Sequence, residues 1–169
     1  EKYRNEEWFQ RTLFIFVADH VSSERMLEKT NSLPECFHII GFMYTPDGAI
    51  PAQHYEHIFS HVDIMPTVLG LMGHDEPYFA IGRDIFNEPQ REPFTLIRSG
   101  YQYLGLMDDY FIDFDGSECF GAYRYDDYEH SNDISSSIEI GRADSLTKAT
   151  LQQYYMHVSQ RNYFPKERK

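Results

Sequence analysis

The sequence has few cysteines, no excess of basic residues and no long apolar run. Its two cysteines, Cys36 and Cys119, lack the CxxC spacing of a zinc knuckle or a redox pair, and whether they pair depends on the fold. A formal net charge of −12 over 169 residues argues against a nucleic-acid-binding surface, because nothing would neutralise the phosphates. No apolar run approaches the roughly 20 residues that span a bilayer. These absences leave a globular chain with an ordinary apolar core.

The first part of the chain has the order strand, loop, strand, helix. Short apolar runs predict strands at residues 12–18 and 38–44, and residues 63–73 predict a helix. Continuous rather than alternating apolar runs are typical of strands covered on both faces in a parallel sheet. For the helix we expect Asp63 as N-cap, Pro66 in the first turn and Gly73 just after the last residue.

The second part is aromatic and partly alternating. Turn signals separate four runs, at residues 94–98, 101–107, 110–115 and 119–125. They predict an antiparallel meander, followed by a polar loop over residues 125–137. An apolar stripe at helical spacing predicts a final helix over residues 142–160. We therefore divide the chain into an α/β part, residues 1–92, and a meander with a terminal helix packed on the same domain, residues 93–169.

The apolar run TLFIFVADH ends abruptly on Asp19 and His20. Neighbouring side chains of a strand point to opposite faces, so the two can reach one point only where the strand has ended. Open α/β sheets place their sites just beyond the carboxyl ends of strands. A carboxylate and an imidazole are common ligands of zinc and manganese. Two ligands do not complete a metal site, so local capping by Asp19 and surface exposure of His20 remain an alternative.

Three further histidines, His54, His57 and His61, have near-helical spacing. That spacing is compatible with a ligand face on a helix. The segment is polar, however, and this favours simple exposure to solvent.

Four segments, taken in order, resemble the C-terminal half of the sulfatase family within the alkaline phosphatase superfamily. They are TLFIFVADH, HIIGFMYTPDGAIP, SHVDIMPTVLGLMG and YFAIGRDIF. The likeness is to the phosphoglycerol transferase and lipoteichoic acid synthase-like branch. It covers about residues 12–86, and the later segments resemble that branch less distinctively. The resemblance implies the C-terminal part of an α/β/α sandwich.

In this family the strand ends in Asp-His and both residues bind the active-site metal, so the resemblance assigns Asp19 and His20 as metal ligands. The metal would be manganese or zinc, with calcium possible. The implied chemistry is transfer through a covalent nucleophile–phosphate intermediate. No catalytic role passes to Asp63 or Pro66. His61 stands where the family usually has a glutamine-like residue.

Family members take their nucleophile and further acidic ligands from an N-terminal half that precedes the Asp-His strand. Only eleven residues precede Thr12, and the first is Glu1. We therefore expect a C-terminal fragment that is inactive alone and whose partner is the missing N-terminal half. Its unpaired sheet edge would favour a homo-oligomer.

The resemblance also implies a substrate and a location. The substrate would be a phosphoglycerol lipid, with a sulfate ester or another phosphate ester as the alternative. The location would be the extracytoplasmic face of a bacterial membrane, with a tether upstream. A non-catalytic interaction module derived from the same fold is the alternative from a different class.

Overall fold

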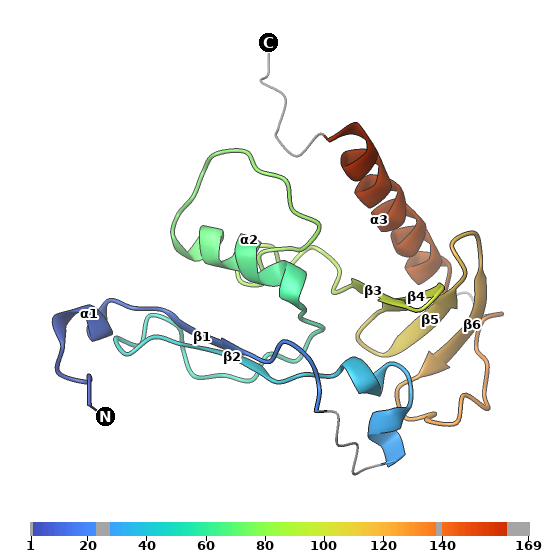
Figure 1. Cartoon of the computed structure of the whole chain (residues 1–169), viewed down its shortest axis with the longest axis horizontal. Coiled ribbons are helices and arrows are strands. Elements are labelled where there is room, and N and C mark those ends of the chain that lie inside the picture. The colour runs from blue at the N-terminus through green and yellow to red at the C-terminus, as the bar shows by residue number, and fades with distance from the viewer. Residues whose placement is uncertain (1, 23–27, 138–139, 162–169) are drawn as a thin grey trace. The chain divides into compact units, whose positions relative to one another are not determined.

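The computed structural model describes residues 2–22, 28–137 and 140–161, which form two compact units, Glu1–Glu56 and His57–Lys169 (Figure 1). The first unit contains α1 (Glu7–Gln10), β1 (Phe14–Val17), two short 3-10 helices (Glu28–Asn31 and Glu35–Phe37) and β2 (Gly41–Tyr44). The second contains α2 (His61–Leu71), β3 (Thr95–Ser99), β4 (Gln102–Leu106), β5 (Tyr110–Phe114), β6 (Cys119–Arg124) and α3 (Ile140–Gln160).

The first unit is built on one strand pair. The two predicted strands are present as β1 and β2, but they pair antiparallel, with Phe14 opposite Tyr44, so the expectation of a parallel arrangement is wrong for this pair. The apolar runs instead place aromatic side chains on the strands. Phe16 stacks on Phe42 with ring centroids 4.6 Å apart, and both remain about half exposed. An apolar run therefore indicated the strands correctly but not their direction, because direction depends on the connection.

The second unit contains the predicted meander. Its four strands pair antiparallel in the order β3-β4-β5-β6. Gly100 and Gly116 turn the chain at positive φ angles of 62° and 105°, a backbone region that glycine enters without a steric cost. Helix α3 lies along this sheet and contacts β4 and β5, so the predicted terminal helix is confirmed (Figure 1).

Strand β5 is buried along its whole length. On one face Ile112 packs in a cluster with Ala143 of α3. Because side chains alternate along a strand, Phe111 lies on the opposite face, where it contacts Tyr123 and His130. The polar segment 125–137 therefore covers an aromatic core.

Two aspartates organise this covering loop. Asp127 accepts hydrogen bonds from the backbone N–H groups of Ser131 and Asn132, at 3.1 and 2.8 Å. Asp133 accepts one from the Ala122 N–H of β6 at 3.1 Å, and Ile134 N–H donates to the Ala122 carbonyl at 2.9 Å. These bonds fix the loop to the sheet. They also pair an N–H and a carbonyl group of β6 that face away from β5.

Helix α2 begins earlier than the sequence predicted. Ser60 is its N-cap and Asp63 is the third helical residue, so the assignment of Asp63 as N-cap is wrong. Asp63 instead accepts a hydrogen bond from Ser60 N–H at 2.9 Å, as in a capping box. Its other oxygen accepts from Arg83 N–H at 2.8 Å. The carboxylate is buried, and it fixes the start of α2 to a segment twenty residues away.

Pro66 lies inside α2 rather than in its first turn. Because proline has no N–H, the Val62 carbonyl lacks its usual helical donor. Gly82 packs directly against this carbonyl, since a Cβ added at residue 82 would lie 2.0 Å from Val62 O. Gly73 follows the helix at a φ of 69°, as predicted for its C-terminal stop.

Gly82→Ala should destabilise the second unit by about 3 kcal/mol, because the added methyl meets rigid backbone of α2. Gly141→Ala is the matched control: the same methyl enters open space in α3, and stability should change by no more than about 1 kcal/mol. Urea unfolding of both variants measures this difference. Equal stability of the two would contradict the close approach of Gly82 to α2.

Asp113 should make the protein less stable as the pH rises. Burial raises the pKa of its carboxyl above the ordinary value of 3.8, with a smaller raising effect from Asp133 and a lowering one from His130. The folded state therefore disfavours the charged form, and stability is lost as the pH rises from the unfolded to the folded pKa. Asp113→Asn should be more stable than the native chain at pH 7, and the difference should vanish once the pH falls well below about 4.

Asp115→Asn provides a control of opposite sign. The backbone N–H groups of Glu118 and Ser117 lower the pKa of this exposed carboxyl. Its contribution to stability is present above the unfolded pKa and is lost as the pH falls, so Asp115→Asn should be less stable at pH 7. Chemical unfolding at both pH values distinguishes the two. A less stable Asp113→Asn at pH 7 would contradict the burial effect.

Candidate functional site

Asp19 and His20 lie just beyond the carboxyl end of β1, whose last residue is Val17. The chain bends there, so the two side chains are no longer held on opposite faces of a strand. Both are exposed, with 90% of the Asp19 side chain and 78% of the His20 side chain accessible to solvent. The structure thus places the predicted pair at the open end of a strand, as the sequence suggested.

Local hydrogen bonds orient both side chains. Asp19 Oδ1 accepts from the backbone N–H of His20 at 3.0 Å. His20 Nδ1 lies 2.7 Å from the Val21 carbonyl oxygen. Since a carbonyl can only accept, Nδ1 carries a proton, and in the neutral ring the lone pair is then on Nε2. Asp19 Oδ2 and His20 Nε2 are therefore left as atoms that could coordinate a metal ion.

These two remaining ligand atoms lie close together. His20 Nε2 and Asp19 Oδ2 are 3.6 Å apart. Two ligands that each lie roughly 2.1 Å from a tetrahedral zinc ion are separated by about 3.4 Å. The pair therefore has the spacing needed to share one divalent cation. Within residues 2–22, 28–137 and 140–161, no group of three or more His, Cys, Asp or Glu side chains is arranged to hold a metal.

The three closely spaced histidines, His54, His57 and His61, do not form a helical face. Residues 51–60 contain no helix, and His61 is the first residue of α2. His54 Nδ1 lies 2.9 Å from Glu56 Oε1. The near-helical spacing of the three residues therefore has no structural counterpart.

His57 has a partner that the sequence did not indicate. Its Nδ1 lies 2.6 Å from Asp108 Oδ2, and the other Asp108 oxygen accepts from Ile58 N–H at 2.7 Å. Asp108 stands in the turn between β4 and β5, where the sequence showed only an Asp-Asp turn signal. The bond connects residues 51 positions apart, and no local pattern could have predicted it.

Both cysteines are free thiols. Burial raises the pKa of the Cys119 thiol, while a hydrogen bond with the backbone of Gly121 lowers it and nearby aspartates raise it further. The described helices include none with the length and apolar character of a membrane span.

Two comparisons find similar proteins. Residues 4–74 match the model of the sulfatase family. That segment includes Asp19, His20 and α2, but not the four-stranded sheet. A crystal structure of a protein in the alkaline phosphatase superfamily from Vibrio parahaemolyticus is similar over 95% of this chain, with a TM-score of 0.71 and 22% sequence identity. No curated protein sequence matches.

The structural match extends beyond the sulfatase segment. The chain corresponds to 38% of the length of the Vibrio protein. The similarity nevertheless covers almost the whole of this chain, so it includes the meander and α3 as well as β1 and β2. The chain therefore has an α/β fold that matches part of an alkaline phosphatase superfamily protein, and its residues 4–74 are similar to the sulfatase family.

Asp108→Asn should destabilise the second unit by about 1 kcal/mol, because it weakens the bonds to His57 and Ile58 at a partly exposed site. Asp109→Asn is the matched control, because Asp109 is the exposed neighbour of Asp108 and its substitution should change stability much less. Urea midpoints at pH 7 test the prediction. If both substitutions had the same effect, the bond between the two segments would not contribute to stability.

Proposed function

We propose that this chain is the C-terminal part of a metal-dependent, sulfatase-like enzyme that acts on phosphate or sulfate esters. The observation that carries the proposal is the convergence of Asp19 Oδ2 and His20 Nε2, 3.6 Å apart, just after β1. The pair lies within the segment that matches the sulfatase family. Both donors are oriented by bonds to neighbouring backbone, which is how protein ligands are commonly prepared for a metal.

Each residue of the pair has a distinct role in this proposal. Asp19 supplies negative charge and a hard oxygen. His20 supplies a neutral nitrogen, and the Val21 carbonyl holds its tautomer. When bound, manganese or zinc, or calcium, would activate the nucleophile and neutralise charge on the ester oxygens. Neither Asp19 nor His20 acts as the nucleophile.

The nucleophile and the remaining ligands would come from a further part of the same catalytic domain. The chain spans 38% of the length of the similar Vibrio protein, which leaves room for such a part. Ile40, just before β2, is 78% exposed, and Phe42, within β2, is 56% exposed. Apolar side chains this exposed favour a covering partner, which would be the N-terminal half of the domain or a second copy of this chain. Without that half, the chain would be inactive.

Two substrate classes follow from this proposal. The resemblance of the sequence to the phosphoglycerol transferase branch favours a phosphoglycerol lipid, handled at the extracytoplasmic face of a bacterial membrane through an upstream tether. The match of residues 4–74 to the sulfatase family favours hydrolysis of a sulfate ester instead. Substrate choice would be decided by the part of the domain that also supplies the nucleophile.

The test uses the product of the complete reading frame that contains this sequence. Asp19→Ala and His20→Ala should each lower turnover of aryl phosphate, aryl sulfate or phosphoglycerol lipid by at least about 100-fold, together with the content of bound metal. His54→Ala is the matched control, because this exposed histidine pairs only locally with Glu56.

The outcomes separate the alternatives. Loss of activity and of metal in both variants, with His54→Ala unchanged, supports the proposed ligands. Full activity in the Asp19 and His20 variants overturns the metal role. A complete reading frame without a nucleophile, whose product turns over none of the three esters, would instead indicate a non-catalytic interaction module.

A further inference from the structure

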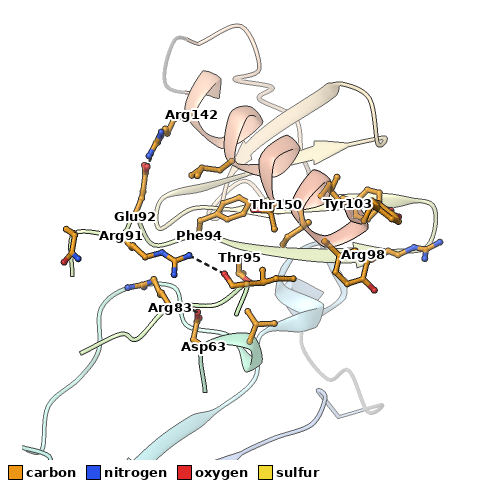
Figure 2. A pocket seen from close by; sticks show the side chains of 18 residues that line it. Asp63, Arg83, Arg91, Glu92, Phe94, Thr95, Arg98, Tyr103, Arg142 and Thr150 are labelled. Atoms are coloured by element: carbon orange, nitrogen blue, oxygen red, sulfur yellow. Dashed lines mark hydrogen bonds and ion pairs between the residues drawn. The ribbon is translucent and has the colours of Figure 1, made fainter. Parts of the chain in front are cut away.

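A cavity of about 530 Å³ lies within the second unit (Figure 2). Its walls are the start of α2, the segment that leads into β3, strand β3 itself and helix α3. Its volume falls in the range of roughly 300–1,000 Å³ that is typical of small-molecule sites. We name it the α3 cavity.

Two side-chain contacts join α3 to the opposite wall, one at each end of the α3 cavity. At one end Arg142 Nε donates to a carboxylate oxygen of Glu92. At the other end the hydroxyls of Tyr103 and Tyr155 lie 2.6 Å apart. Arg142 and Tyr155 are thirteen residues apart on the helix, which corresponds to about 20 Å. The α3 cavity is therefore an elongated space that runs along the helix between two fixed ends.

The floor of the α3 cavity is apolar. Phe94 and Leu96 line it from the side of β3, and Leu146 and Leu151 line it from α3. Phe94 and Thr150 lie in the middle of the space, between the two ends (Figure 2). Apolar walls of this kind favour the apolar body of a ligand over bulk water.

The charge of the α3 cavity is opposite to that of the chain. Four arginines line it, at residues 83, 91, 98 and 142, against the two acids Asp63 and Glu92. Glu88, which lies outside the lining, pairs with Arg91 and leaves a surplus of one positive charge, in a chain whose net charge is −12. Asp63 is already committed, because its oxygens accept from Ser60 and Arg83. The potential inside the α3 cavity therefore favours an anion.

Two of the arginines lie at one end of the α3 cavity, where Arg91 pairs with Glu88 and Arg142 pairs with Glu92. Arg91 and Arg142 both lie beside Glu92 (Figure 2). Arg91 donates to the Gly82 carbonyl and to Glu88 through Nη1, at 3.0 and 3.1 Å. Arg142 uses only Nε for Glu92, and its two Nη nitrogens have no hydrogen-bond partner among the described residues. The Arg142 end can therefore bind an anionic group without breaking an existing bond.

We propose that the α3 cavity binds a small amphipathic organic anion. Its acidic group lies at the end formed by Arg91 and Arg142, and its apolar body lies along the floor toward Leu151. Guanidinium groups bind carboxylate, sulfonate and phosphate oxygens through charge-assisted hydrogen bonds, so any of these head groups fits. The inference does not rest on the proposed metal role of Asp19 and His20, because the α3 cavity is formed within residues 62–155.

The experiment uses a matched pair of probes and the intact chain. Naphthalene-2-sulfonate carries the anionic group, and naphthalene-2-sulfonamide has nearly the same shape without the charge. Binding is measured by calorimetry, and by the NMR shifts of the Leu146 and Leu151 methyl groups, which lie in the α3 cavity. The sulfonate should bind about tenfold more tightly than the sulfonamide at low salt, and should shift both methyl groups.

Substitutions at the Arg142 end should change the affinity for the sulfonate in opposite directions. Arg142→Gln should weaken sulfonate binding about fivefold to tenfold and leave the sulfonamide unchanged. Glu92→Gln should strengthen sulfonate binding, because it removes a negative charge beside Arg142 that repels the anion. Arg11→Gln is the control for Arg142→Gln, because it removes one positive charge at an exposed site in the first unit and should leave sulfonate binding unchanged.

A bulky side chain inside the α3 cavity gives an independent test. Thr150→Trp should abolish binding of both probes, because the indole fills the space. Equal affinity for sulfonate and sulfonamide would overturn the proposal, as would unchanged sulfonate binding in Arg142→Gln. Retained binding in a folded Thr150→Trp would overturn it as well. If Thr150→Trp does not fold, the opposite effects at Arg142 and Glu92 still decide the question.

Discussion

The buried carboxylate of Asp63 is the contact on which the second unit depends. One oxygen fixes the start of α2 and the other holds the backbone of Arg83. Thr67 extends the same connection, because its hydroxyl accepts from Ile85 N–H at 3.2 Å. The segment after Gly82 is thereby aligned along α2 before it enters β3. A side chain that sequence reasoning treated as a helix cap is in fact the joint between a helix and a distant segment.

The sequence predicted most of the second unit because its contacts are local. The four strands of the meander pair with their neighbours, and glycine turns such as Gly100 and Gly116 mark the connections. Helix α3 could be predicted from its apolar stripe alone. The direction of β1 against β2 could not, because more than twenty residues separate them and an apolar run carries no information on strand direction.

The candidate metal pair could be predicted for the same reason. Asp19 and His20 are adjacent, and the end of an apolar run places them. The bond between His57 and Asp108, and the α3 cavity, join residues that are dozens of positions apart. Their chemistry depends on tertiary packing, which spacing along one chain does not reveal. Arg91 and Arg142 lie in no motif of the sequence, and their importance comes only from meeting Glu92 at one end of the α3 cavity.

The loop over residues 125–137 also protects the sheet from unwanted partners. Strand β6 is the last strand of its sheet, so its outer backbone groups are available for pairing with another chain. Asp133 and Ile134 occupy the N–H and carbonyl of Ala122 on that edge. An incoming strand would have to displace both bonds and uncover Phe111. The loop therefore acts against edge-to-edge aggregation, a danger that a predominantly antiparallel unit faces whenever an outer strand is left open.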